Sequence, residues 1–352
     1  MTNDFLPFLK DLIRLPGLSG YEAPVRQRIQ AEWEPLVDEI SISRLGSLHA
    51  LKRGNGRGSR PCLLLAAHMD AIGLMVTEIT DGFLRLTAIG GIDARILPGQ
   101  CVIVHGRQEL PGLIFLPPDS CLPIAKKDEP IALEHLLVDL GLSPSRIARL
   151  VRPGDPISFA QPPIMLGENK LAGHSLDNRA SVAALTICLM ELQARKHHWD
   201  LMAVATTQEE ETFAGAKTSA FDIRPNLAVA VDVTFGRSTG LPEHKTYPLN
   251  DGPTNGWGPG IHPAVFRVLK ETAERAEIPS TTEIMPVRTG TDADALQITA
   301  EGIPTGVVSI PLRYMHTPVE VVSLADIRRT GRLLAAFVAE LEIDFVEHIT
   351  WE

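Results

Sequence analysis

Cysteine is scarce in this sequence, and its spacing is irregular. The 352 residues include four cysteines, at Cys62, Cys101, Cys121 and Cys188. None belongs to a Cys-x-x-Cys pair, which argues against a disulfide framework and against a thiolate zinc site. No apolar run is long enough to cross a membrane, and charges interrupt the apolar pattern of the N-terminal segment, unlike a signal peptide. We therefore expect a cytoplasmic protein in a reducing compartment.

Basic residues are outnumbered, and aromatic residues are few. Lys and Arg total 33 against 43 Asp and Glu, a formal net charge of -10, so neither nucleic acid nor an anionic membrane is an expected partner. Aromatic side chains make up 5% of the chain and offer little surface for stacking sugars. The hydrophobic content of 44% is typical of a soluble globular protein with one large domain or two ordinary ones.

Short apolar runs alternate with amphipathic segments along most of the chain. Buried strands are predicted from the runs at 61–67, 201–205, 227–231 and 305–310. Helical spacing of apolar residues predicts helices over 4–14, 263–276 and 324–341, and another after Asp177-Asn178-Arg179. This alternation favours an α/β fold with a mixed or parallel sheet sandwiched by helices.

The sequence pattern changes between about residues 71 and 165. Short β-rich pieces separated by Gly, Pro and Asp turns predict a small β-barrel or sandwich there, with a brief helix over 133–140. We interpret 71–165 as a domain inserted into a main domain formed by 1–70 and 166–352.

Carboxylates and histidines follow the predicted core strands. Three adjacent acids come directly after the run 201–205, where their mutual repulsion calls for a cation. The candidates are His68, Asp70, Asp177, Glu209, Glu210, Glu211, Asp232 and His316. Taken singly, each has a plainer interpretation as a structural histidine, a helix cap or a turn residue. Together they form an N/O ligand set that suits zinc, cobalt or manganese, with enough ligands for two ions sharing one carboxylate.

These motifs resemble the M42 metallo-aminopeptidases, a family that includes glutamyl aminopeptidases and tetrahedral dodecameric peptidases. The matching segments are Ala67-His68-Met69-Asp70-Ala71-Ile72-Gly73-Leu74-Met75-Val76, Ser175-Leu176-Asp177-Asn178-Arg179, Gln208-Glu209-Glu210, Val231-Asp232, Gly290-Thr291-Asp292-Ala293 and His316-Thr317-Pro318-Val319-Glu320. They occur in the family's order and span nearly the whole chain.

The resemblance implies a role for each site residue. The implied ligands of two divalent ions are His68, Asp177, Glu210, Asp232 and His316, with Asp177 bridging and the histidines on opposite ions. Asp70 would accept the other imidazole N–H of His68 and fix its tautomer. Glu209 would be the general base that takes the proton of a metal-bridging water. The Asp177–Asn178 peptide bond is implied to be cis.

The segment after the glutamate pair departs from the family pattern. Glu211-Thr212-Phe213-Ala214 stands where relatives commonly have an apolar residue, glycine and an arginine. Glu211 is either a residue of a solvated turn or of a local salt bridge, or it supports the site residues or contacts the substrate amine. The Gly290 to Asp292 loop is expected to line the pocket, although Asp292 is an equally good helix cap. Arg288 and Arg313 are either contacts for an acidic substrate group or simply solvated.

The sequence thus predicts a di-metal aminopeptidase that acts on short peptides. The inserted domain is expected to form homodimers that assemble into a homododecamer, or else to serve only as a lid on a dimer. The alternatives are a related deacylase or carboxypeptidase acting on blocked substrates, and a catalytically silent scaffold particle. A glycosidase ranks low, because it would leave the two histidines without a role.

Overall fold

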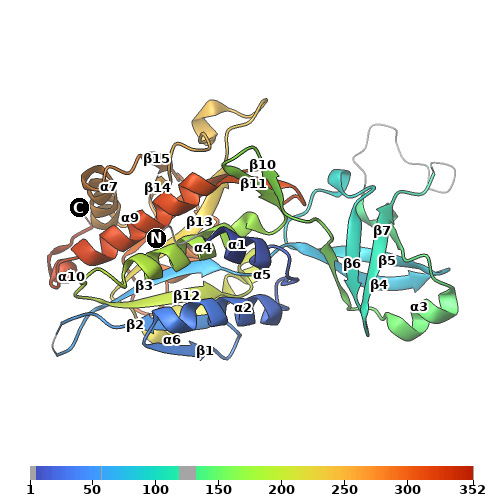
Figure 1. Ribbon diagram of the computed structural model, residues 1–352, viewed down its shortest axis with the longest axis horizontal. Coiled ribbons are helices and arrows are strands. Elements are labelled where there is room, and N and C mark those ends of the chain that lie inside the picture. The colour runs from blue at the N-terminus through green and yellow to red at the C-terminus, as the bar shows by residue number, and fades with distance from the viewer. Residues whose placement is uncertain (1–4, 57, 119–131, 352) are drawn as a thin grey trace.

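The computed structural model describes residues 5–56, 58–118 and 132–351, so Cys121 lies outside the described part of the chain. The chain forms a large α/β unit and a smaller β-barrel, which lie at the left and right of Figure 1. The fold predicted from the sequence is confirmed, including the inserted β-rich region. Among the described residues, Cys62, Cys101 and Cys188 are free thiols.

An 11-stranded mixed sheet is the centre of the larger unit. Its main order is β1-β2-β12-β3-β13-β16-β17-β11-β10, with β14 pairing to β15 and β16. The strands are β1 (Glu39–Ile42), β2 (Leu48–Lys52), β3 (Cys62–His68), β10 (Ile164–Leu166), β11 (Lys170–Gly173), β12 (Asp200–Thr206), β13 (Leu227–Phe235), β14 (Thr254–Trp257), β15 (Thr281–Ile284), β16 (Thr305–Arg313) and β17 (Glu320–Ser323). The four central strands β12, β3, β13 and β16 run parallel. Their largely apolar sequences fit this position, because both faces are covered.

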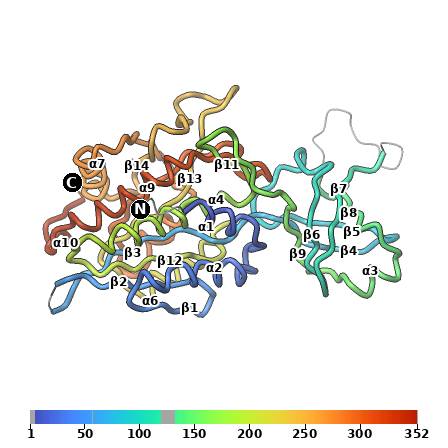
Figure 2. Tube along the Cα trace, in the orientation of Figure 1, coloured from blue at the N-terminus to red at the C-terminus, as the bar shows by residue number. Residues whose placement is uncertain are grey.

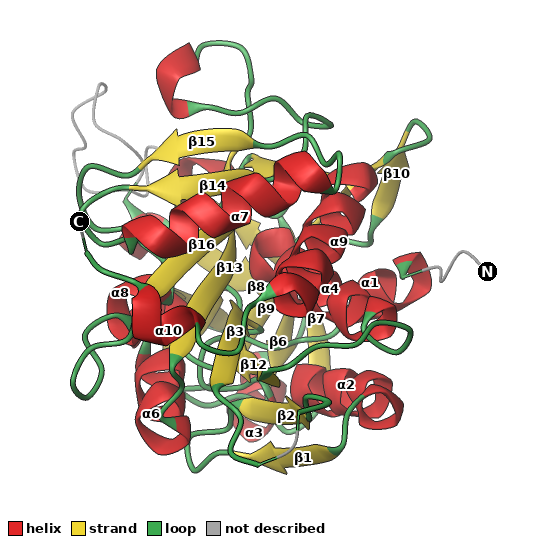
Figure 3. Ribbon diagram, turned by 90° about the vertical axis from the view of Figure 1, so that its left-hand side faces the viewer, coloured by secondary structure: helices red, strands yellow, loops and turns green. Residues whose placement is uncertain are grey.

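Helices cover both faces of this sheet, as Figure 3 shows. One face is covered by α1 (Leu6–Leu12), α2 (Ala23–Trp33), α4 (Leu176–Glu191), α7 (Pro263–Arg275) and α9 (Leu324–Glu340), with α10 (Phe345–His348) at its end. The other is covered by α6 (Ala214–Ile223) and α8 (Ala293–Leu296). A four-residue helix, α5 (Glu209–Thr212), follows β12 directly. Among the residues that the structure describes, no helix is long and apolar enough to span a membrane.

The smaller unit is a closed antiparallel barrel with its own apolar core. Its strand order is β4-β5-β8-β7-β6-β9. The strands are β4 (Gly73–Thr80), β5 (Phe83–Ile89), β6 (Cys101–His105), β7 (Glu109–Phe115), β8 (Leu137–Asp139) and β9 (Pro156–Phe159), and α3 (Pro144–Leu150) packs beside them. In Figure 2 the chain crosses to this unit after β3 and returns after β9, so the barrel is inserted between two parts of the larger unit.

The predicted helix over 133–140 is wrong. Leu133–His135 form one 3₁₀ turn, and Leu137–Asp139 form strand β8, which pairs with β5 and β7. Leu136 and Val138 are fully buried while Asp139 is exposed. This alternation with a period of two suits a barrel strand, and the closing hydrogen bonds come from strands distant in sequence, which outweigh local helix propensity.

Candidate metal centre

The core of the site lies at the carboxyl edge of the parallel strands. His68 is the last residue of β3 and lies opposite Thr206, the last residue of β12. Asp232 lies in β13, the neighbour of β3 on its other side. His68 Nε2 is 3.8 Å from the nearer carboxylate oxygen of Asp232. Because parallel strands end at one edge, their functional groups meet there, as the sequence predicts.

Asp177 is placed between the two histidines. Its Oδ1 is 3.2 Å from His68 Nε2, and its Oδ2 is 3.5 Å from His316 Nε2. Asp177 is the second residue of α4, and its bond to Asn178 is cis, as the resemblance implies. His316 comes from the loop between β16 and β17 and has a left-handed φ of 60°. The two oxygens of one buried carboxylate therefore face two different imidazoles.

The glutamate pair divides between these groups. Glu209 Oε2 lies 3.7 Å from His68 Nε2, whereas Glu210 Oε2 lies 3.4 Å from His316 Nε2. The two residues open the short helix α5, in which successive side chains are about 100° apart around the axis. Adjacent residues therefore reach opposite parts of the site.

The Asp70 carboxylate holds the start of α5 in position. Its Oδ1 accepts a hydrogen bond from the backbone N–H of Glu209 (3.0 Å), and its Oδ2 accepts one from that of Glu210 (3.2 Å). Oδ1 also lies 3.4 Å from His68 Nδ1, which is 3.2 Å from the Asp70 carbonyl oxygen. The buried carboxylate of Asp70 thus positions His68 and both glutamates. The resemblance implies only its contact with the imidazole of His68.

Glu320 has the corresponding position on the other side of the site. Its Oε2 accepts a hydrogen bond from the Asp177 backbone N–H (3.0 Å), and its Oε1 accepts one from that of His316 (3.2 Å). The side chain is 1% exposed. Sequence reasoning missed this residue, although it ends the quoted motif that starts at His316. The carboxylate of Glu320 therefore fixes Asp177 relative to His316.

Replacing Glu320 by glutamine tests this role. An amide presents an N–H group to one of the two backbone N–H donors, so one hydrogen bond is lost and replaced by repulsion. We expect zinc affinity to fall about 10–100-fold, the usual cost of losing a group that orients metal ligands. Competition with a chromophoric chelator measures the affinity, and circular dichroism checks the fold. Unchanged affinity in a folded Glu320→Gln protein would contradict the role.

The barrel also touches the site, through a glycine pair after β5. Gly91 makes a backbone hydrogen bond to the His316 side chain, and a Cβ on Gly91 would lie 2.9 Å from His316 Nδ1. Glu211, the residue that departs from the family pattern, accepts a hydrogen bond from the Gly90 N–H at 2.6 Å. Its carboxylate therefore joins α5 to the barrel. Only the glycines themselves signalled this close approach in the sequence.

The site contains far more negative charge than the nearby basic side chains neutralise. The buried acids are Asp70, Asp177, Glu209, Glu210, Asp232, Asp292 and Glu320. Burial, and then mutual repulsion, raise the pKa values of Glu209, Glu210 and Asp232 well above the usual range. Burial alone would lower the pKa of His68, but the carboxylates around it, Glu209 first, raise it well above the ordinary value.

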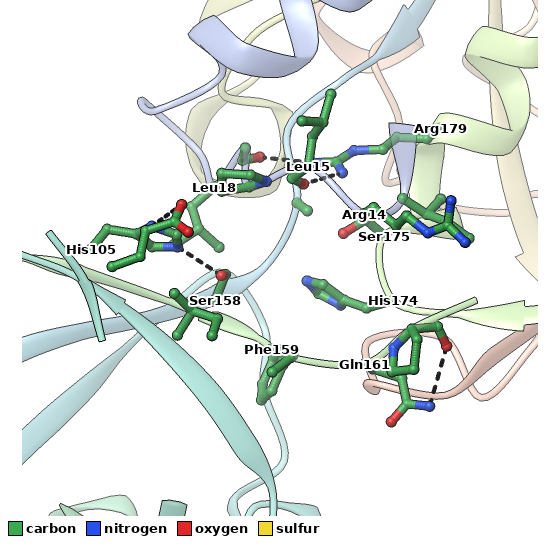
Figure 4. Close-up of a pocket in the computed structure, with 18 residues that line it drawn as sticks. Arg14, Leu15, Leu18, His105, Ser158, Phe159, Gln161, His174, Ser175 and Arg179 are labelled. Atoms are coloured by element: carbon green, nitrogen blue, oxygen red, sulfur yellow. Dashed lines mark hydrogen bonds and ion pairs between the residues drawn. The ribbon is translucent and has the colours of Figure 1, made fainter. Parts of the chain in front are cut away.

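Arg179 is the one fully buried arginine among the described residues, and its hydrogen bonds are used elsewhere. Its guanidinium donates to the carbonyl oxygens of Leu12, Leu15, Gly17 and Met69. Figure 4 shows it beside Leu15, at a separate cavity of about 240 Å³ between the two units. Burial lowers its pKa to about 10, so it remains charged. Its charge attracts Asp70 and Glu320, but a single cation cannot balance seven acids.

The donor set fits divalent cations. His68, Glu209 and Asp232 form one group whose ligand atoms lie within 4.8 Å of one another, and His68, Asp177 and Glu210 form another. The Oε1 atom of Glu210 is buried without a hydrogen-bond partner. Imidazole nitrogens with carboxylate oxygens and no sulfur suit zinc, cobalt or manganese. Positive charge at this place would relieve the repulsion that raises the carboxyl pKa values.

The Gly290 to Asp292 loop borders the site in two different ways. Gly290 has a φ of 68°, and its N–H donates to Asp294. Asp292 is 2% exposed and accepts a hydrogen bond from Thr206 Oγ1 at 2.5 Å, while its side chain makes no capping hydrogen bond. Burial raises its pKa to about 6. Asp292 therefore supports the end of β12 rather than the start of α8.

A cavity of about 360 Å³ opens over these residues. Its lining includes His68, Asp177, Glu209, Glu210, Asp232, His316, Gly290 and Thr291, and the walls continue through Phe213, Thr234, Phe235, Glu283, Met285 and Met315. Neither Arg288 nor Arg313 is part of this lining, and Arg313 donates instead to the Arg237 carbonyl. A substrate in this cavity would meet the candidate metal ligands directly.

Comparison with known proteins identifies relatives over nearly the full length. Residues 46–333 match the model of the M42 glutamyl aminopeptidase family. A lysyl aminopeptidase of Pyrococcus furiosus is 35% identical, over 96% of this chain and 98% of that protein. The structure of aminopeptidase APDkam598 from Desulfurococcus kamchatkensis superposes with a TM-score of 0.90 at 32% identity, covering 98% of this chain and 97% of that one.

A structure of the Pyrococcus horikoshii TET1 peptidase is also similar, with a TM-score of 0.83 and 29% identity over 96% of this chain and 100% of that one. That peptidase can assemble into a tetrahedron or a large octahedral shell.

Proposed function

This chain belongs to the M42 glutamyl aminopeptidase family and is an aminopeptidase, and we propose that it removes N-terminal residues from short peptides with two divalent ions, zinc or cobalt and less favourably manganese. The observation that carries this proposal is the position of Asp177, whose two oxygens face two different histidines. One carboxylate so placed is suited to bridge two ions.

Five side chains would hold the ions. His68 and Asp232 lie on one side of Asp177, and Glu210 and His316 lie on the other. Asp70 and Glu320 hold these ligands in place through four backbone hydrogen bonds. When bound, the ions would lower the pKa of water and polarise the scissile carbonyl.

Glu209 supplies the proton transfers. It lies beside His68 and lines the cavity, where water and substrate would reach it. Its carboxylate takes a proton from the attacking water and returns it to the amine that leaves when the peptide bond breaks. Burial raises the pKa of this carboxyl above its ordinary value, which strengthens it as a base.

Chelation and reconstitution test the proposal. Purified protein is assayed on free-amine aminoacyl anilides and on their N-acetylated counterparts, before chelation, after it, and after zinc or cobalt is added back. We expect cleavage of the free-amine set alone, abolished by chelation and restored by metal. Cleavage of the acetylated set would favour a deacylase, and metal-independent cleavage would exclude the proposed centre.

We further propose that residues 71–165 form the dimerisation domain and that 1–70 with 166–352 form the catalytic domain. The dimers would assemble into a homododecamer, as supported by the tetrahedral assembly of the P. horikoshii relative. A mass measurement in solution distinguishes a dodecamer from a dimer whose barrel is only a lid.

A further inference from the structure

The substrate cavity contains one carboxylate that the proposed chemistry does not use. Glu283, in β15, lines the same cavity as His68, Glu209 and His316. It belongs to neither of the two candidate metal groups. In Figure 3, β15 lies beside β14 at the margin of the sheet, and none of the candidate ligands comes from either strand.

Two hydroxyl groups fix the orientation of this carboxylate. Its Oε1 accepts a hydrogen bond from Thr234 Oγ1 and its Oε2 accepts one from Thr254 Oγ1, both at 2.5 Å. Burial raises the pKa of Glu283, and these hydrogen bonds oppose that rise. A carboxylate whose two oxygens both accept hydrogen bonds has a fixed orientation, and these bonds favour its charged form.

Glu283 has no lysine or arginine counter-ion in the described part of the chain. Within the described ranges, no lysine or arginine forms an ion pair with Glu283, and none belongs to the cavity lining. The candidate metal ligands would be balanced by their ions, but Glu283 stands apart from them. The structure therefore offers an oriented, unpaired negative charge to whatever enters the cavity.

The position of this charge matches the end of a long substrate side chain. Thr234, which binds Glu283, is two residues beyond Asp232 on β13, so both side chains lie on one face of the strand, roughly 7 Å apart. The neighbouring walls, Phe213, Phe235 and Met285, are apolar. A lysine has a flexible four-carbon stem that packs along apolar surface and ends in a compact cation.

We propose that Glu283 determines specificity and that the enzyme prefers peptides whose N-terminal residue is lysine or arginine. The inference rests on the proposed aminopeptidase function and adds the chemistry of the first side chain. An N-terminal glutamate would instead bring a like charge toward Glu283 in a cavity lined by no lysine or arginine, so it is disfavoured. The preferred substrate thus differs from the one in the family's description.

A matched substrate pair tests this proposal. Lysyl and norleucyl anilides share the same apolar stem and differ in the terminal ammonium group. We expect wild-type kcat/KM to be higher for the lysyl and arginyl anilides than for the norleucyl one, and lowest for the glutamyl one. In Glu283→Gln, kcat/KM for the basic substrates should fall about 10–100-fold, while the norleucyl value changes by less than about threefold.

The norleucyl substrate also serves as the folding control, because a misfolded variant would lose all activity. Glu347→Gln, a change at an exposed residue of α10, should leave every value unchanged. An equal loss on all substrates would overturn the inference, since Glu283 would then hold the α-amine or only the fold. A wild-type preference for norleucyl or glutamyl substrates would also overturn it and leave the aminopeptidase proposal intact. Failure to cleave any free-amine anilide would refute the proposed function itself.

Discussion

Replacing Glu209 by glutamine should lower kcat by about 10²–10⁴-fold, the usual contribution of a positioned general base. The amide keeps the size of the side chain and loses the ability to take a proton. Glu209 lies among the candidate ligands, with Oε2 3.7 Å from His68 Nε2 and with Asp232 in the same group. The position alone would therefore suit a ligand as well as a base.

Metal content separates these two roles. If Glu209 is the base, Glu209→Gln should retain two ions per chain by elemental analysis and keep KM within a small factor. Loss of an ion together with activity would make Glu209 a ligand and contradict the assigned role. Glu274→Gln, at an exposed position of α7, is the matched control and should keep wild-type kcat.

The core of the site could be predicted from the sequence because its signals are local. His68 follows a wholly apolar run, the glutamates follow another, and Asp232 lies within a third. Parallel strands bring such residues to one edge without any knowledge of the loops. The family match confirms the resemblance from which the individual roles were inferred.

The supporting residues could not be predicted, because their contacts join distant parts of the chain. Glu320 binds the backbone of Asp177, 143 positions away, and Gly91 reaches His316 from the barrel. Glu283 enters the substrate cavity only because β15 pairs with β14. Such contacts depend on strand order and loop path, which no period of two or 3.6 residues encodes. The prediction of a helix over 133–140 fails for the same reason, because closure of the barrel determines the structure of this segment.

The buried carboxylates of Asp70 and Glu320 support the site in the same way. Asp70 binds the backbone of Glu209 and Glu210, and Glu320 binds that of Asp177 and His316. Each uses both oxygens on two backbone N–H groups, so each fixes two functional residues at once. Such an arrangement adds further negative charge to an already acidic site. It therefore favours cation binding while it limits the movement of the ligands.

The Asp177 carboxylate contacts both histidines, so the positions of both proposed ions depend on it. Its two oxygens lie 3.2 Å and 3.5 Å from the Nε2 atoms of His68 and His316. Burial alone would raise its pKa, but the hydrogen bonds from His316 and His68 hold the pKa far below its ordinary value. It is thus the carboxylate of the cluster that most strongly retains its charge.

Changing Asp177 to asparagine should remove metal and activity together. The amide keeps one oxygen but turns an N–H group toward one ion position and removes the charge that both ions would share. We expect less than one ion per chain and a loss in kcat/KM of about 10³-fold or more, because both proposed ions contribute to the chemistry. Asp251→Asn, at an exposed loop position, should leave both values unchanged. Two retained ions with near wild-type activity in Asp177→Asn would show that Asp177 is not a bridge, and the two-ion centre would have to be built on other residues.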